Sequence, residues 1–204
     1  MNLFGEGRYG RAHPVGRSGG RAETGRGRAR VQRTCSGERS RWTSSLNADT
    51  IAQGLSAYRP EAAAVAAGRV MLARLRFLSA GRRDFAFETT LAGRGHAQWL
   101  RELRSAGYRT HLVFLSLTSA TLAVARVAER VEQGGHDVPE HIVRRRFSAG
   151  LRNLFAFYMP VVEGWDVYDN SNMSGPMLIA SGSAGNSVVV ADVIRWKRLE
   201  NQLP

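Results

Sequence analysis

Several residue types and patterns are scarce in this chain of 204 residues, and each absence excludes a class of protein. Cys35 is the single cysteine, so no internal disulfide can form, which fits a reducing compartment such as the cytoplasm. No window approaches the roughly 20 continuous apolar residues of a membrane span. Residues 1–16 also lack the apolar segment of a secretory signal. We therefore expect a cytoplasmic protein with one ordinary domain and no membrane partner.

Lysine is almost absent, since Lys197 is the only one among 29 basic residues. The net charge of +12 is unevenly distributed along the chain. Residues 1–45 hold ten arginines against three glutamates, a net charge of +7, and are rich in Gly and Ser without a periodic apolar pattern. The composition predicts a boundary near residue 46, with a disordered Arg/Gly-rich segment over 1–45 and a folded domain over 46–204.

Helical and strand patterns alternate from residue 46 onward. Apolar residues at helical spacing predict helices over 60–81, 95–107, 119–134 and 138–160. Apolar, aromatic and β-branched runs predict strands over 85–91, 109–117, 165–171 and 177–182. Residues 190–202 predict a last helix or strand–helix piece. This alternation is typical of an α/β fold, in which a parallel sheet carries helices on both faces.

The end of one predicted strand carries polar residues. In an α/β sheet, ligands bind at the carboxyl ends of the strands. The run FAFETTL places Glu88, Thr89 and Thr90 at such an end. A carboxylate there needs a partner, because an unpaired charge in apolar surroundings is costly. A salt bridge to an arginine-rich helix is the structural alternative for Glu88, and a turn is the alternative for Thr90.

Arginines lie on both sides of a glycine-containing connection. Arg126 and Arg130 are four residues apart on a predicted helix, and Arg144, Arg145 and Arg146 follow the segment VEQGGHDVPEH. This arrangement is typical of a kinase lid, whose guanidinium groups close over phosphate oxygens. Because three consecutive helical residues point in different directions, only some of them can do so. A solvated basic helix face is the alternative.

Other conspicuous residues have structural explanations. We expect Trp99, Phe114 and Trp165 in the core. His136 has only an adjacent aspartate at metal-ligand spacing, so no metal site built from side chains is predicted. Asp169 stands at a strand end, where it could approach a nucleotide or form a turn.

Several ordered motifs resemble those of the zeta-toxin-like P-loop kinases. They are NAD at 47–49, YRPEAAAVAAGRVML, FAFETTLAGR, GYRTHLVFLSL, ARVAERVEQGGHDVPEHIVRRRF, GLRNLF and WDVYDNS. The resemblance covers about residues 46–180. It implies a P-loop NTPase-like fold and transfer of the γ-phosphoryl group of ATP or GTP, with Mg²⁺, to a small-molecule hydroxyl. In zeta toxins the acceptor is a UDP-linked amino sugar, and an antitoxin protein is a further partner.

The resemblance also implies a role for individual residues. Asp49 matches the aspartate that accepts the proton of the attacking hydroxyl, although an N-cap of the following helix explains an aspartate there equally well. The other implied residues are Glu88, Thr89 and Thr90 for substrate binding, Arg130 and Arg145 for catalysis, and Arg126 and Arg146 for nucleotide binding.

A P-loop kinase needs the phosphate-binding sequence G-x-x-x-x-G-K-[ST], which this chain does not contain. The segment RAETGRGRAR at 21–30 suggests why. One choice of the codons permitted for these residues, read from the third base of the first codon, encodes G-R-N-G-A-G-K-S-T. We therefore expect residues 1–45 to be an out-of-frame translation, so that the first strand and the phosphate loop are missing. The alternative is a natural Arg/Gly arm through which a non-catalytic protein binds nucleic acid electrostatically.

Overall fold

The structure is a computed structural model that describes most of the chain from residue 45 onward. The described residues are 45–56, 60–133, 135, 137–183 and 188–203, together with the backbone of short strands at 7–10 and 13–14. The expectations for Cys35, for most of the segment 1–45 and for His136 fall outside the described residues.

Apart from α2, for which no helix was predicted, the helices follow the predicted apolar periodicity. They are α2 (Ala48–Leu55), α3 (Pro60–Ala80), α4 (Gly95–Ser105), α5 (Ala120–Glu132), α6 (Glu140–Asn153) and α7 (Val193–Glu200). Ser119 caps α5, because its hydroxyl accepts a hydrogen bond from the Leu122 N–H. The predicted helix over 138–160 changes character in its last part, where α6 continues into a π-helical turn, η1 (Leu154–Tyr158).

The strands form one larger sheet and two strand pairs among the described residues. They are β1 (Gly7–Gly10), β2 (His13–Pro14), β3 (Ser45–Leu46), β4 (Ala86–Phe87), β5 (Tyr108–Arg109), β6 (His111–Ser116), β7 (Gly164–Asp169), β8 (Met177–Ser183) and β9 (Val189–Val190). The larger sheet has the order β1-β6-β7-β8-β9, and β3 pairs with β4 and β2 with β5. β4 is shorter than the predicted strand over 85–91, since the residues after Glu88 form a loop.

The α/β class is confirmed, and the sheet is mixed where a parallel sheet was predicted. β6 and β7 are parallel, as are β3 and β4, whereas β8 runs antiparallel to β7 and β9 antiparallel to β8. The connection over 170–176 is short and contains Gly175 at a φ of 100°. A connection of this length joins antiparallel neighbours, because a parallel crossover needs a dozen or more residues.

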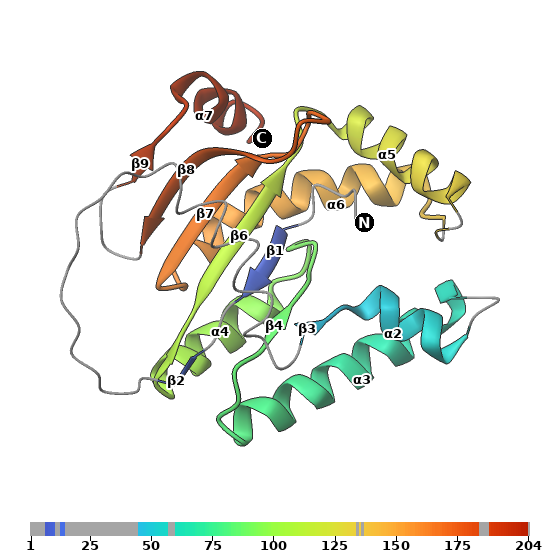
Figure 1. Cartoon of the computed structure of the whole chain (residues 1–204), viewed down its shortest axis with the longest axis vertical. Coiled ribbons are helices and arrows are strands. Elements are labelled where there is room, and N and C mark those ends of the chain that lie inside the picture. Colours follow the sequence, from blue (N-terminus) through green and yellow to red (C-terminus); the bar gives the residue numbers. More distant parts are fainter. Residues whose placement is uncertain are drawn as a thin grey trace.

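One strand, β1, lies between the β3–β4 pair and β6. Among the described residues, β4 and β6 do not pair with each other. β1 pairs with β6 in the antiparallel direction and also contacts β4. Figure 1 shows β1 between these two strands. The backbone of Gly7–Gly10 therefore occupies the place where a strand joining the two parts of the sheet would lie.

The core confirms the predicted roles of the large aromatic residues. Phe114 and Trp165 are buried on β6 and β7, and the half-buried Trp99 of α4 stacks on Phe85 with ring centroids 5.7 Å apart. The core also takes side chains from α3, α6 and α7, including Leu75, which is 1 % exposed. Each such side chain contributes about 1.5–3 kcal/mol to folding. Figure 1 shows α6 running behind β6 and β7, where it covers one face of the sheet.

Candidate functional site

The predicted site residue Glu88 meets Asn47 at the carboxyl ends of β3 and β4. Because these strands are parallel and Leu46 pairs with Phe87, their ends lie side by side. The Glu88 N–H extends the pairing by donating to the Leu46 carbonyl at 2.9 Å. One step further, the Asn47 side-chain amide donates to the Glu88 carboxylate at 2.7 Å. The Glu88 carboxylate therefore has the partner that its position requires.

Asn47 also caps the helix that carries Asp49. Its side-chain oxygen accepts from the Asp49 N–H at 2.8 Å, so Asn47 is the N-cap of α2. Asp49 itself lies in the first turn of the helix and is half-buried. The N-cap explanation of Asp49 is wrong, because the preceding Asn47 already performs that function. The carboxylate stands at the helix N-terminus, where the helix dipole favours a negative charge.

The loop after β4 is shaped by its own threonines. The Thr89 hydroxyl accepts from the Leu91 N–H at 3.3 Å, and the Thr90 hydroxyl accepts from the Ala92 N–H at 3.4 Å. The turn that was the alternative explanation of Thr90 is therefore present, and a role of Thr90 in substrate binding stays a prediction. Leu91 has a φ of 55°, in the left-handed region, and is completely buried. A branched residue adopts this conformation only where its surroundings impose it.

The GLRNLF motif contains Asn153, a residue for which no role was predicted. The Asn153 side-chain amide donates to the carbonyls of Leu91 and Ala92 at 2.8 and 3.1 Å. The Tyr158 hydroxyl donates to the Gly93 carbonyl at 2.6 Å. Burial raises the pKa of Tyr158 to about 12, so this hydroxyl keeps its proton well above pH 10. The signal available in the sequence was a buried Asn in a helix, a residue that needs a partner.

Gly150 brings α6 close to the same loop, which leads to a stability prediction. A Cβ atom at this position would lie 2.6 Å from the Thr90 carbonyl oxygen, whereas one at Gly68 in α3 would meet nothing within 4 Å. We expect Gly150→Ala to lower the free energy of unfolding by about 1–3 kcal/mol. The matched variant Gly68→Ala should raise it by about 0.5–1 kcal/mol, because alanine favours helices. Urea denaturation measures both, and equal effects would contradict the close approach of α6.

The predicted arginines lie in three different environments. Arg126 is buried, and its Nη2 donates to the Ser171 carbonyl at 3.0 Å, while Nη1 has no hydrogen-bond partner among the described residues. Arg130 is half-buried at the end of α5, where Gly135 approaches it closely and donates its N–H to the Arg130 carbonyl at 2.9 Å. Arg145 and Arg146 are exposed on α6. The predicted lid residues thus lie on α5 and α6, on either side of the connection over 133–139.

Arg144 is explained by a local contact. Its guanidinium pairs with Glu140 one helical turn earlier, at 2.7 Å. Such exposed pairs contribute only a few tenths of a kcal/mol, about 0.3–0.5. Arg144 therefore belongs to the solvated face of α6, as the alternative interpretation of the arginine run allowed.

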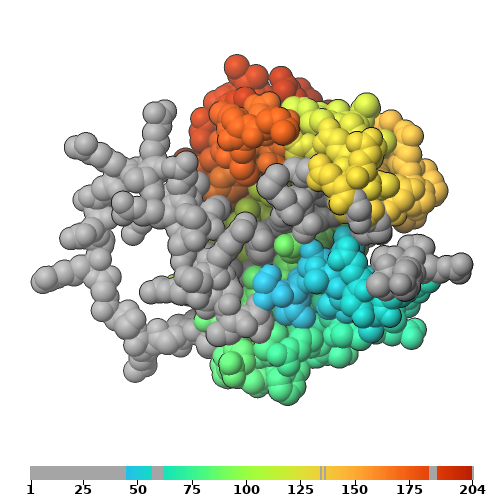
Figure 2. Space-filling model, turned by 45° about the vertical axis from the view of Figure 1, so that its right-hand side comes forward, coloured from blue at the N-terminus to red at the C-terminus, as the bar shows by residue number. Residues whose placement is uncertain are grey.

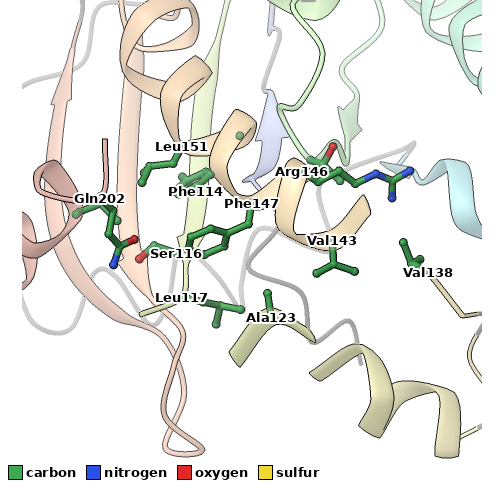
Figure 3. Close-up of a pocket in the computed structure, with 13 residues that line it drawn as sticks. Phe114, Ser116, Leu117, Ala123, Val138, Val143, Arg146, Phe147, Leu151 and Gln202 are labelled. Carbon is green, nitrogen blue, oxygen red and sulfur yellow. The ribbon is translucent and has the colours of Figure 1, made fainter. Parts of the chain in front are cut away.

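A pocket joins Thr90 and Arg146. It lies between α5, α6, β6 and the C-terminal residues, and its wall is largely apolar, with Phe114, Phe147 and Leu151 among its residues. Figure 3 shows Arg146 extending from α6 away from this apolar wall, toward the side on which β3 and α2 lie. Figure 2 shows that α2 and α5 are exposed on the same face of the molecule.

The carboxyl ends of β6 and β7 form a second polar cluster. The Ser171 N–H donates to one oxygen of Asp169, and Arg195 Nε donates to the other at 2.9 Å. The Thr118 N–H donates to the Ser171 hydroxyl at 2.9 Å. Asp169 is therefore explained by the turn and by its contact with α7. The hydrogen bond from Arg126 to Ser171 connects α5 to this cluster.

No group of three or more His, Cys, Asp or Glu side chains is placed to hold a metal ion within the described ranges. In the same part of the chain, no helix is long and apolar enough to cross a membrane.

The fold defines an α/β protein with a polar site at the carboxyl ends of its strands, and a family match places it with the P-loop NTPase-like folds. The sequence profile described as zeta toxin matches residues 40–174, about two thirds of the chain. The chain belongs to the zeta toxin family. It is also 28% identical over 102 residues to an uncharacterized protein of Haemophilus influenzae, covering 50% of this chain and 73% of that protein. No solved structure matches the chain.

Proposed function

We propose that the gene encodes a kinase of the zeta toxin type, which transfers the γ-phosphoryl group of ATP or GTP to a hydroxyl of a small molecule such as a UDP-linked amino sugar. One observation carries the proposal: at the ends of two parallel strands, the Asn47 side chain bonds the Glu88 carboxylate and also caps the helix whose first turn carries Asp49. Phosphoryl transfer asks the protein for little covalent chemistry, so positioned carboxylates and arginines are its main requirement.

Within this proposal each residue has a stated task. Asp49 accepts the proton of the attacking hydroxyl, while Glu88, Thr89 and Thr90 hold the acceptor molecule. Arg130 and Arg145 neutralise the phosphate oxygens during transfer, and Arg126 and Arg146 bind the nucleotide. For Arg126 the relevant atom is Nη1, the terminal nitrogen without a partner among the described residues.

The residues of the 204-residue chain do not by themselves fit ATP·Mg²⁺. Lys197, the single lysine, is exposed on α7, outside the region that matches the family. No G-x-x-x-x-G-K-[ST] sequence is present to cradle the phosphates or to bring a hydroxyl to Mg²⁺. We therefore propose that the chain as printed is inactive or nearly so.

We further propose that residues 1–45 are read out of frame and that the correct frame encodes the missing first strand and phosphate loop. The position between β4 and β6 supports this, since it lies beside a strand whose carboxyl end already carries the candidate site. A parallel strand in that position would end at the same edge as β3, β4 and β6, which is where a phosphate loop must lie. A phosphoryl-transfer assay on the frame-restored protein tests the proposed function.

A further inference from the structure

The loop from Thr89 to Gly93 is held in a defined and unfavourable shape. Leu91 is buried in the left-handed conformation, and both threonine hydroxyls accept hydrogen bonds from backbone N–H groups two residues ahead. Left-handed leucine persists only where other contacts impose it, and such strain gathers at functional sites. An external restraint on this loop is therefore required.

The restraint comes from the junction of α6 and η1. Asn153 is 2 % exposed and donates to two successive loop carbonyls, and the completely buried Tyr158 donates to the third. Three consecutive carbonyls, those of Leu91, Ala92 and Gly93, are thus turned toward one helical segment. These contacts cross more than 60 positions of sequence, so they fix the loop from outside.

The π-helical turn explains how both side chains reach the loop. In an α-helix of 3.6 residues per turn, residues five apart point about 140° away from each other. In η1 the Met159 N–H donates to the Leu154 carbonyl, five residues earlier, at 2.9 Å. This wider turn brings residues five apart closer to the same side of the helix. Asn153 and Tyr158, which are five apart, can therefore act on the same loop.

We propose that Asn153 and Tyr158 are positioning residues that hold the hydroxyls of Thr89 and Thr90 for the acceptor molecule. Since each hydroxyl already accepts from the backbone, its own hydrogen is left to donate to an acceptor oxygen. Thr90 faces the pocket that Arg146 also lines. The restraint on the loop stands independently, whereas the role of these hydroxyls in binding an acceptor rests on the proposed function.

The test is amide hydrogen exchange on the full 204-residue chain carrying Tyr158→Phe. Removal of one hydrogen bond to the loop should accelerate exchange of the peptide 88–94 about fivefold to tenfold. The matched control is Tyr108→Phe, because the Tyr108 hydroxyl likewise donates to a backbone carbonyl, that of Ser79, at 3.0 Å. The control should accelerate exchange near the end of α3 and leave the peptide 88–94 unchanged.

Asn153→Ser is a second variant with the same expectation for peptide 88–94. Unchanged exchange of that peptide in both Tyr158→Phe and Asn153→Ser would overturn the proposal. In the frame-restored protein, Tyr158→Phe should raise the KM for the acceptor several-fold and leave the KM for nucleotide unchanged. An equal change in both constants, or a loss of kcat alone, would indicate a purely structural role. Absence of any transfer would contradict the proposed function without altering the exchange result.

Discussion

A protein whose residues ahead of Leu46 are read in the shifted frame should bind ATP·Mg²⁺ at least about 100-fold more tightly than the 204-residue chain, which corresponds to about 2.8 kcal/mol. The reason is the phosphate loop. Its backbone N–H groups and its lysine form charge-assisted hydrogen bonds to the phosphates, each contributing about 1.5–3 kcal/mol. Isothermal titration calorimetry measures both affinities, and the frame-restored protein should also form ADP in the presence of a hydroxyl acceptor.

The control is the frame-restored protein with alanine in place of the loop lysine, which retains the strand and the glycines. Its affinity should fall most of the way back to that of the 204-residue chain. Tight binding by the 204-residue chain, or equal binding by the lysine-free control, would show that the phosphates are held elsewhere.

Asp49→Asn should lower kcat of the frame-restored protein about 10²–10⁴-fold, the usual contribution of a positioned base. The substitution keeps the size of the side chain and removes the atom that accepts the proton. It should leave α2 intact, because the cap of this helix is Asn47. A single-turnover assay separates this chemical step from nucleotide binding, which should not change.

Glu163→Gln is the matched control for Asp49→Asn. Glu163 is exposed and directly precedes β7, at the end of the sheet opposite the candidate site. The Glu163→Gln variant also loses one carboxylate, but its kcat should be unchanged. If Asp49→Asn retained full kcat, the carboxylate would be serving only the helix dipole, and the acceptor proton would need another base.

The alternative interpretation, that residues 1–45 are a nucleic-acid-binding arm, can be tested separately. A natural arm would bind DNA or RNA without sequence preference and with strong salt dependence, because phosphate contacts release counterions. Deletion of residues 1–45 would abolish such binding. The frame hypothesis assigns no function to these arginines, so nucleic-acid binding that weakens steeply with salt and is lost on this deletion would favour the arm.

Local patterns were sufficient to predict most of the elements. The apolar spacing over 60–80 defines α3, and Ser119 defines the start of α5, because both signals act within a few residues. The direction of β8 could also have been predicted. Alternation of helix and strand favoured a parallel sheet, but no helix fits in the connection over 170–176. Connection length was the stronger signal.

The restraint on the candidate loop could not be predicted from the sequence. Asn153 and Tyr158 act across more than 60 positions, and their common direction depends on a π-helical turn that apolar periodicity does not distinguish from an α-helix. The link from Asn47 to Glu88 is hidden for the same reason, since it exists only once β3 and β4 pair. Sequence reasoning located the polar strand ends but not the groups that hold them.

We propose that this α/β domain belongs to a P-loop kinase whose phosphate loop is encoded in another frame. Sequencing the gene from upstream of codon 1 through codon 50 tests it most directly. We predict codons at positions 21–30 that encode G-x-x-x-x-G-K-[ST] in the shifted frame, with a single insertion or deletion that restores the frame before Leu46. Codons that exclude the loop lysine in every frame would contradict the account.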